Sequence, residues 1–383
     1  MVSSHVVGTI NIVTVLAIAP LIKSDLSLSA TQFGFFVTAY YLAQAVWSIP
    51  AGGIVDRFGV GRSLIACHII MAISALLLGI AQSYELCLVA LFLMGIGYAM
   101  VNPATGRGVL AWYPSHRRGT AMGIKQFGVP LGGIFAAGNG VLATAIAWQS
   151  LMLGIAGLIL FNGALCLYLL KFFKPRVAGR PSLMSNIRTV MKDTNVNSFA
   201  LLNGMVNLGQ TNFFAFLTLF LRDVAGASQP MAGLAMGLAQ TTSAISRLGW
   251  GVVGDKWFLG RRKVLMAWIC GAGSVFLMMM YWVGPGWGLW YGLGLVAFLG
   301  ITIASFAPVA QAIAAEMVKP ELAGSAMGYN MTGVHIGGMV GPPLFGAVVD
   351  WSGSYGAGWL ITSVIVLFGT GVLIFKFREG TAQ

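Results

Sequence analysis

The sequence GGIVDRFGVGR, residues 52–62, is a short charged segment that lies between two long apolar runs. A degraded copy of it, GVVGDKWFLGRRK, occurs at residues 251–263. In each copy a glycine is followed after three residues by an acid and a base, the pairs being Asp56–Arg57 and Asp255–Lys256. Glycine permits close backbone approach, and a carboxylate beside cationic groups can pair with a neighbouring helix end. The recurrence predicts two copies of one structural unit, each with a charged turn between apolar helices.

The composition indicates a membrane protein. Of the 383 residues, 57% are hydrophobic and only 8% are charged, whereas about a quarter of the residues of a soluble domain are charged. A membrane-spanning helix needs about 20 apolar residues, while barrel strands would show alternating segments of about 10 residues, which are not evident. The predicted fold is therefore an all-α membrane protein with twelve transmembrane helices in two pseudo-symmetric six-helix bundles. The twelve apolar runs cover residues 2–22, 31–51, 63–82, 86–111, 119–142, 150–170, 197–221, 230–250, 264–283, 288–312, 323–347 and 357–376.

The net charge of +12 reports membrane orientation rather than nucleic-acid binding. When the twelve runs are threaded from a cytoplasmic start, 17 of the 22 lysines and arginines fall in cytoplasmic loops and the C-terminal tail. This asymmetry follows the positive-inside rule. We therefore expect a multi-pass protein of the cell inner (plasma) membrane, with both termini in the cytoplasm and no nucleic-acid partner. The first run has no basic segment before it, so a cleaved signal peptide is not expected.

An internal repeat supports the two-bundle organisation. The segments GTAMGIKQFGVPLGG, residues 119–133, and GSAMGYNMTGVHIGG, residues 324–338, share eight of fifteen residues without a gap. The same offset superimposes Pro103 on Pro308. Such a duplication is typical of transporters built from two related halves. We predict an N-terminal bundle at 1–170, a cytoplasmic linker at 171–196 and a C-terminal bundle at 197–383.

The repeat is most informative where its two copies differ. Lys125 matches Asn330, and His335 matches Pro130. Glycines shared by both copies suit close helix packing. The residues that differ are positions where one half could have acquired its own chemistry, so Lys125 and His335 are candidate site residues.

Polar side chains on the predicted helices supply further candidates. An amide stripe with i, i+4, i+7 spacing is costly against lipid and should face a cavity or another helix. An arginine within a span either faces the bundle interior or reaches the membrane surface with its long side chain. An aromatic stripe on the second span is more often packing than a ligand cage. The candidate cavity-lining residues are Asn203, Asn207 and Gln210 of the stripe, together with Arg247, Arg107, Asn11, Tyr40 and Gln44.

The cations in the predicted spans indicate the ligand class. Arg107, Lys125 and Arg247 lie within spans, whereas the carboxylates lie at helix ends or in loops. A charge pair at 4 Å is worth about 4 kcal/mol at an effective dielectric of 20, which is similar to the cost of burial. A planar guanidinium can also bind a carboxylate through two hydrogen bonds. The sequence therefore favours a small organic anion, most simply a carboxylate.

Catalytic and cofactor chemistry is not indicated. The four cysteines have no CxxC spacing, and neither a metal-ligand pattern, a phosphate-binding loop nor a nucleophile with a base is evident. We therefore expect no cofactor, no metal and no enzymatic activity.

The charged segment at 52–62 resembles the loop between the second and third helices of major facilitator superfamily transporters. Their pattern G-x-x-x-D-[RK]-x-G is matched at Gly52, Asp56, Arg57 and Gly59. The resemblance covers essentially the whole chain. It implies that these charges help to close the cytoplasmic side, with Asp56, Arg57 and Asp255 as gating residues.

A second resemblance points to anion permeases within that superfamily. SRLGWGVVGDK, residues 246–256, is similar to the eighth helix of monocarboxylate transporters and oxalate–formate exchangers, whose matching arginine binds the substrate carboxylate. This resemblance implies that Arg247 is the main anion ligand. Residues 102–103 and 117–132 also resemble the fourth and fifth helices of the monocarboxylate family, and similar bacterial sequences are grouped with cyanate or anion permeases.

The chain departs from that family at positions used for proton coupling. Ser243 stands where monocarboxylate transporters have an aspartate, and Leu91 stands where the superfamily has an arginine. The first-helix lysine of the monocarboxylate family has no counterpart. If transport is coupled to protons, either His335 or the substrate carboxylate itself carries the proton.

These features predict a monomeric secondary transporter in which two bundles rock around a central site and move a small organic anion, by symport or exchange. Arg247 is the main ligand, Lys125 supplements it, and His335 is a ligand or a proton carrier. Two alternatives remain. GVPLGG at 128–133 and GGMVGPP at 337–343 resemble a motif of drug or neutral-solute exporters, and a membrane sensor could bind a ligand without moving it.

Overall fold

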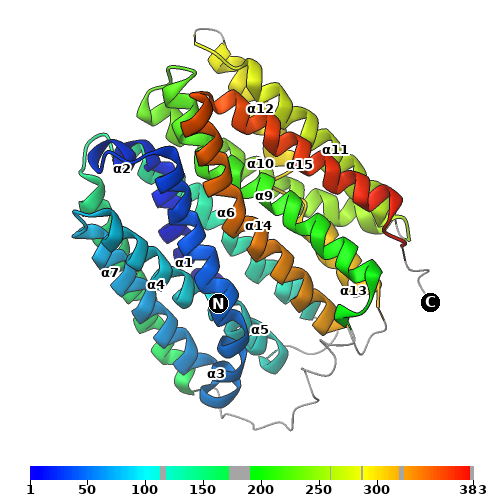
Figure 1. Ribbon diagram of the computed structural model, residues 1–383. Helices are drawn as coiled ribbons and strands as arrows, with labels where there is room; N and C mark the ends of the chain where they lie inside the picture. The colour runs from blue at the N-terminus through cyan, green and yellow to red at the C-terminus, as the bar shows by residue number, and fades with distance from the viewer. Residues whose placement is uncertain (113–117, 172–189, 259, 286–287, 319–322, 380–383) are drawn as a thin grey trace. The chain divides into compact units, whose positions relative to one another are not determined.

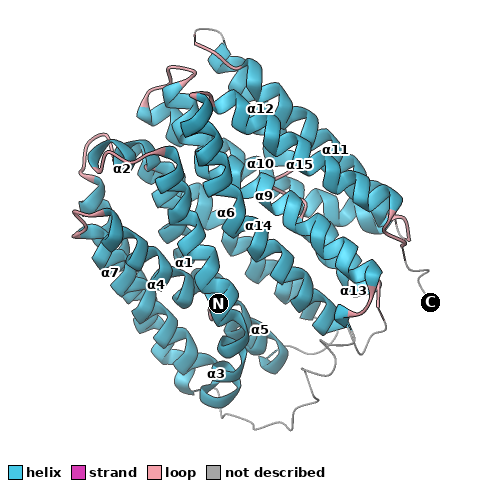
Figure 2. Ribbon diagram, viewed as in Figure 1, coloured by secondary structure: helices cyan, strands magenta, loops and turns pink. Residues whose placement is uncertain are grey.

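The computed structural model describes residues 1–112, 118–171, 190–258, 260–285, 288–318 and 323–379. All regular elements in these ranges are helices (Figures 1 and 2). The contacts between residues define two compact units. Unit 1 comprises Met1–Ala178 with Ser228–Gly237, and unit 2 comprises Gly179–Ala227 with Leu238–Gln383. Most of the predicted linker lies outside the described residues, so the linker and domain boundaries stay predictions.

The helices of unit 1 follow the first six predicted spans. The first span is a helix pair bent by 57°, with Pro20 in the first turn of the second segment, and the fourth span is broken just before Pro103. Proline suits the first turn of a helix and disrupts its interior, which explains both positions. The elements are α1 (Val2–Ala17), α2 (Ala19–Asp25), α3 (Ala30–Gly79), α4 (Tyr84–Ala99), α5 (Val101–Trp112), α6 (Arg118–Leu142), α7 (Trp148–Leu165) and the 3₁₀ turn η2 (Cys166–Lys171).

The helices of unit 2 follow the last six predicted spans, although the first turns of α10 are grouped with unit 1. The tenth span is broken before Pro308, as the fourth is before Pro103. The elements are α9 (Thr194–Asp223), α10 (Gln229–Lys256), α11 (Arg262–Met279), η3 (Met280–Trp282), α12 (Gly288–Ile301), α13 (Ala307–Glu316), α14 (Ala323–Ser352) and α15 (Tyr355–Phe375). Helices therefore occupy all twelve predicted spans.

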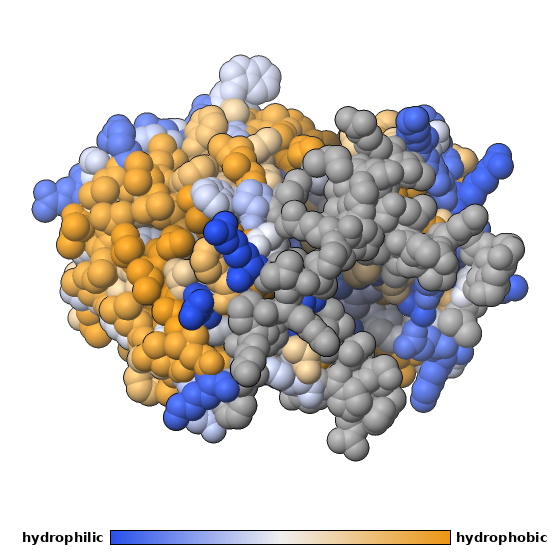
Figure 3. All heavy atoms as spheres, turned by 90° about the horizontal axis from the view of Figure 1, so that it is seen from below, coloured by the Kyte–Doolittle hydropathy of each residue, from blue (hydrophilic) through white to orange (hydrophobic). Residues whose placement is uncertain are grey.

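Eight of these spans are long and apolar enough to cross a membrane when the bent pair α1–α2 is taken as one span. The first half of α3, α6, α10 and the broken pair α12–α13 fall outside that set, because they carry polar residues or are interrupted. Large hydrophobic side chains such as Ile73, Val89 and Phe161 are exposed on the outer helices of unit 1. Hydrophobic residues likewise gather over a broad flank in the space-filling view (Figure 3). This surface suits contact with lipid, and the chain is a multi-pass membrane protein.

The charged turn at residues 52–62 is shorter than the sequence predicts. Helix α3 continues through most of this segment, and its backbone departs from helical geometry at Gly59, which has φ 81° and ψ 168°. In the second copy α10 ends at Lys256, and Gly260 has φ 72°. Positive φ is unstrained for glycine and costly for other residues. A glycine therefore sets the change of direction in each copy, while the acid–base pair lies on the preceding helix.

Close helix contact in unit 1 occurs where α6 crosses α1, here called the first crossing. A Cβ added to Gly128 would lie 2.7 Å from the backbone oxygen of Val2. One added to Gly132 would overlap the backbone oxygen of Val6. The two glycines let the helix backbones touch, as in the small-xxx-small pattern of membrane helices.

Unit 2 repeats this geometry where α14 crosses α9, here called the second crossing. Cβ atoms added to Gly333 and Gly337 would overlap the backbone oxygens of Ala200 and Gly204, respectively. The glycine pairs are related by the offset of the sequence repeat. The contacted residues on α1 and α9 are also related by a constant offset, since Val2 corresponds to Ala200 and Val6 corresponds to Gly204. By this offset His5 corresponds to Asn203. By the offset of the sequence repeat, Lys125 corresponds to Asn330.

Candidate functional site

Arg247, the predicted anion ligand, lies on α10 and is held beside the break between α12 and α13. Its Nε donates a hydrogen bond to the Ser243 hydroxyl at 3.3 Å, and a terminal nitrogen donates to the backbone oxygen of Ala304 at 3.0 Å. Ser243 lies one turn earlier on α10 and donates to the same oxygen at 2.7 Å. The guanidinium is half-buried, and both of these hydrogen bonds go to neutral groups.

The break between α12 and α13 supplies the acceptors of this site. Backbone oxygens at a helix end have no intrahelical donor and must find other partners. Gln210 of α9 donates to the oxygens of Ala304 at 2.9 Å and Ile303 at 3.3 Å, while the Trp250 indole donates to the oxygen of Ile301 at 2.7 Å. Two side chains of α10 and one of α9 thus converge on the oxygen of Ala304, and this cluster fixes the position of Arg247.

The other two amides of the predicted stripe bond to α14. Asn203 donates to the Asn330 side-chain oxygen at 2.7 Å, and Asn207 donates to the backbone oxygen of Val334 at 2.7 Å. The sequence left a cavity and a neighbouring helix as alternatives, and these hydrogen bonds go to a neighbouring helix. His335 follows Val334 and is half-buried. A role in substrate contact stays a prediction for these residues.

Lys125 is the buried cation of unit 1. Its side chain on α6 is 5% exposed, and Nζ donates to the backbone and side-chain oxygens of Asn102 at 3.3 and 3.4 Å. Asn102 is exposed, and its side-chain oxygen also accepts from Gln126 at 3.4 Å. The ammonium group therefore lies directly beneath an exposed polar pair and, like Arg247, is held by neutral oxygens.

The remaining candidates of unit 1 lie on α1, α3 and α5. Asn11 is completely buried and donates to the backbone oxygen of Met71 at 3.3 Å. The ring of Tyr40 packs edge-on against Tyr41 and lies 6.2 Å from the ring of Tyr98. Gln44 and Arg107 are half-buried on α3 and α5, respectively.

The predicted gating residues differ in their surroundings. Arg57 is exposed and lies over the Phe58 ring at 5.4 Å, while the side chain of Asp56 is outside the described part of the chain. Asp255 accepts from Arg262 at 2.8 Å, and Arg262 also pairs with Glu316 at 3.2 Å. Arg262 therefore ties the ends of α10 and α13 to the start of α11.

Sequence reasoning missed His5. This histidine is completely buried in α1, and its Nε2 lies 3.0 Å from the Thr105 hydroxyl of α5. It lies at the first crossing, where a Cβ on Gly128 would come within 2.9 Å of the His5 Cβ. Its match to Asn203 of the amide stripe follows from the contacts of the two crossings, and the sequence alone carried no signal for it.

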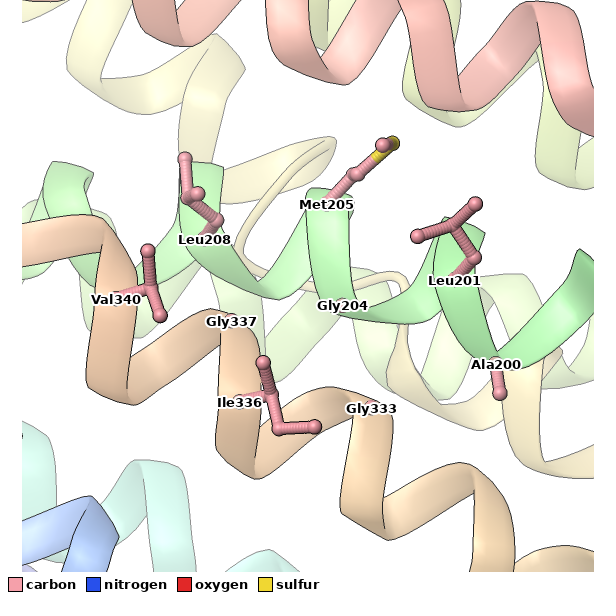
Figure 4. A pocket seen from close by; sticks show the side chains of 9 residues that line it. All are labelled: Ala200, Leu201, Gly204, Met205, Leu208, Gly333, Ile336, Gly337 and Val340. Carbon is pink, nitrogen blue, oxygen red and sulfur yellow. The ribbon is translucent and has the colours of Figure 1, made fainter. Parts of the chain in front are cut away.

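The described pockets do not include Lys125 or Arg247. One, with a volume of about 270 Å³, lies at the second crossing and has an apolar lining (Figure 4). It exists because Gly204, Gly333 and Gly337 present no side chains to it. The other, of about 700 Å³, lies between α11 and α15 and is mostly apolar. Lys263 and Thr370 are the polar residues of this second lining.

Known proteins resemble this chain over nearly its whole length. The hexuronate transporter of Bacillus subtilis (strain 168) is 25% identical over 92% of this chain and 87% of its own length. The multidrug resistance protein MdtG of Enterobacter lignolyticus is 27% identical over 88% and 80%. Monocarboxylate transporter 13 of Bos taurus is also 27% identical, over 88% and 79%.

A solved structure confirms the predicted architecture. The nucleoside transporter NupG, solved as its D323A mutant, superimposes with a TM-score of 0.81 over 98% of this chain and 99% of that chain, at 14% identity. The family model of the Major Facilitator Superfamily matches twice, at residues 1–201 and 199–382. With twelve helical spans, two matches of the family model and relatives that include transporters of organic acids, the chain belongs to the Major Facilitator Superfamily of transporters.

Proposed function

We propose that this protein is a secondary transporter of a small organic anion, most simply a carboxylate, which works by alternating access. The observation that carries the proposal is that each unit holds a cationic side chain within a predicted span by hydrogen bonds to neutral oxygens. These are Lys125 on α6 and Arg247 on α10. A charge in that environment is costly and is commonly functional in membrane proteins.

Arg247 is the main anion ligand in this proposal. The Ser243 hydroxyl and the Ala304 oxygen fix two of its N–H groups, so the plane of the guanidinium is set before an anion arrives. A preorganised planar fork can donate two parallel hydrogen bonds to a carboxylate. Lys125 contributes a compact second charge, and the other polar candidates, including His335, line the path.

The names of two relatives support this substrate class. These two are named for organic acids, a hexuronate and monocarboxylates, while MdtG is named for multidrug resistance. An exporter of neutral or cationic compounds is therefore the second candidate. Buried cations would repel cationic drugs, which favours the anion transporter.

A ligand screen separates these candidates. Purified protein is heated with glucuronate, lactate or sulfoacetate, and with glucose and tetraphenylphosphonium as neutral and cationic probes. A ligand that binds only the folded state at 100 times its dissociation constant stabilises that state by about 2.7 kcal/mol. We expect at least one acid to raise the melting temperature, whereas stabilisation by tetraphenylphosphonium alone would favour the exporter.

Replacing Arg247 by lysine tests its role. Arg247→Lys keeps the charge but loses the planar fork, and the loss of a hydrogen bond to a charged group, about 1.5–3 kcal/mol, predicts binding weaker by about 10- to 100-fold. Arg261→Lys, at an exposed position before α11, is the matched control. Uptake of the same acid into proteoliposomes should be lost in the first variant and kept in the second. Wild-type uptake by Arg247→Lys would refute the assignment.

The cellular setting is also proposed. The charge distribution favours the cell inner membrane, with both termini in the cytoplasm. The proposed protein is a monomer whose partners are lipid, its anion and protons, and it binds no nucleic acid. Accessibility of cysteines introduced at Arg261 and Ser352 to a membrane-impermeant reagent would test the orientation, since these residues lie at opposite ends of predicted spans.

A further inference from the structure

The hydrogen bonds around His5 leave one ring nitrogen open. The nearest acceptor of the Thr105 hydroxyl is the backbone oxygen of Val101, at 2.6 Å, and we assign its single hydrogen to that bond, which makes its oxygen the acceptor toward His5. Nε2 of His5 must then carry the hydrogen. Nδ1 bears the lone pair and has no hydrogen-bond partner among the described residues, although His5 is completely buried.

The other fully buried histidine among the described residues of unit 1 shows the usual arrangement. Nδ1 of His68 bonds to the backbone oxygen of Leu64 at 2.5 Å, and Nε2 accepts from the Asn162 side chain at 2.6 Å. Both nitrogens are thus occupied, as is typical of buried polar groups. His5 is the exception within the same unit, and its open nitrogen calls for an explanation.

The corresponding place in unit 2 holds no titratable group. His5 and Lys125 at the first crossing match Asn203 and Asn330 at the second. There the two amides bond to each other at 2.7 Å and form a neutral pair. The equivalent helix contact in unit 1 therefore carries an imidazole and an ammonium group. The two copies have kept the same helix packing but differ in the chemistry of these side chains.

We propose that His5 is the proton-binding residue of this transporter: its Nδ1 takes up one proton from water when an organic anion binds at Lys125, and returns that proton to water when the anion leaves. The step forms one N–H bond and converts a neutral imidazole to an imidazolium, with no other change of bonding. This inference rests on the proposed function and adds to it the coupling residue.

The charges around His5 explain why proton and anion would bind together. The facing groups are the ammonium of Lys125 from α6, the phenol ring of Tyr98 from α4, the neutral Thr105 hydroxyl from α5, and the Met1 amino group of this chain. Both amines oppose a further positive charge on the imidazole. An anion on Lys125 offsets this repulsion and favours the imidazolium.

Measuring proton uptake together with anion binding tests the proposal. Purified protein in weakly buffered solution is titrated with sulfoacetate or glucuronate at pH 6 to 7.5, while a pH dye reports protons and calorimetry reports binding. Sulfoacetate keeps an ionised sulfonate, so that group cannot itself carry the proton. We expect up to about one proton per anion bound, and an affinity that rises by as much as about tenfold per unit fall in pH.

The variants separate His5 from other proton carriers. His5→Asn should bind the anion without proton uptake and with an affinity independent of pH, while His68→Asn should keep the uptake. His5→Asn combined with Lys125→Asn rebuilds the amide pair of the second crossing, and its melting temperature shows whether the crossing still folds.

Each outcome decides one question. Unchanged proton uptake in His5→Asn overturns the assignment of His5. If neither acid binds the wild-type protein, the proposed substrate class fails and the inference fails with it. An N-terminally extended form, which moves the amino group away, should give the wild-type result, and loss of uptake in that form would assign the proton to the amino group instead.

Discussion

Helix crossings that depend on glycine make a quantitative prediction about stability. At the first crossing, a Cβ on Gly128 would lie 2.7 Å from the Val2 oxygen and 2.9 Å from the His5 Cβ, whereas ordinary contacts begin at 3.4 Å. In Gly128→Ala the two backbones must therefore separate by roughly 0.7 Å. Overpacking of this kind typically costs about 1–3 kcal/mol, and alanine regains up to about 1 kcal/mol through its higher helix propensity. When the full propensity gain is subtracted, the net expected loss is about 0–2 kcal/mol.

The second crossing should respond more strongly. A Cβ on Gly337 would overlap the Gly204 oxygen, and this acceptor belongs to the backbone of α9 and cannot rotate away. Gly138 on α6 and Gly328 on α14 have nothing within 4 Å of an added Cβ, and so provide matched controls on the same two helices. Alanine at either control position should leave stability unchanged or raise it.

Thermal unfolding of the purified variants, followed by tryptophan fluorescence, measures this series. The expected order of melting temperatures is Gly138→Ala and Gly328→Ala at or above wild type, then Gly128→Ala, then Gly337→Ala. If Gly337→Ala melts as high as Gly328→Ala, backbone contact does not determine the crossing and the reasoning fails.

Two hydrogen bonds give further predictions. Tyr355→Phe removes the hydrogen bond that the hydroxyl donates to Asp223 at 2.7 Å, which joins the start of α15 to the end of α9; we expect a loss of about 1.5–3 kcal/mol, and an unchanged melting temperature would contradict it. Asn162→Ala deprives Nε2 of His68 of its donor and should cost about 1–3 kcal/mol. A double-mutant cycle with His68→Leu should then show a cost smaller than the sum of the single costs, because the two side chains share one interaction.

Much of the fold could be predicted from local sequence properties. Apolar runs of about 20 residues must form helices in a membrane, because no other local structure satisfies every backbone group there. The duplication could be recognised in the sequence because residues 119–133 and 324–338 share glycines, and these glycines allow close packing of neighbouring helices. The length of the charged turn, however, was overestimated from the sequence. Charge in the segment at 52–62 suggested a turn, but the helix continues to Gly59, because positive φ is unstrained for glycine and costly for most other residues.

The candidate site was less predictable. The sequence identified Lys125 and Arg247 as charges within spans, since their cost in lipid does not depend on their partners. It did not reveal that Arg247 would contact the oxygen of Ala304, which lies far away in the chain and is available because of the break between α12 and α13. The two helices meet only after folding, so no local pattern encodes this contact.

By itself, the sequence determined the helices, their duplication and the presence of cations within the spans, because hydropathy, glycine spacing and charge are properties of each segment alone. Only the tertiary structure decided which polar atoms were satisfied. The same class of side chain is fully bonded at His68 and left with an open nitrogen at His5. That difference arises from which helix faces each ring, and hydrogen bonding depends on position and direction that the chain acquires only when its helices pack.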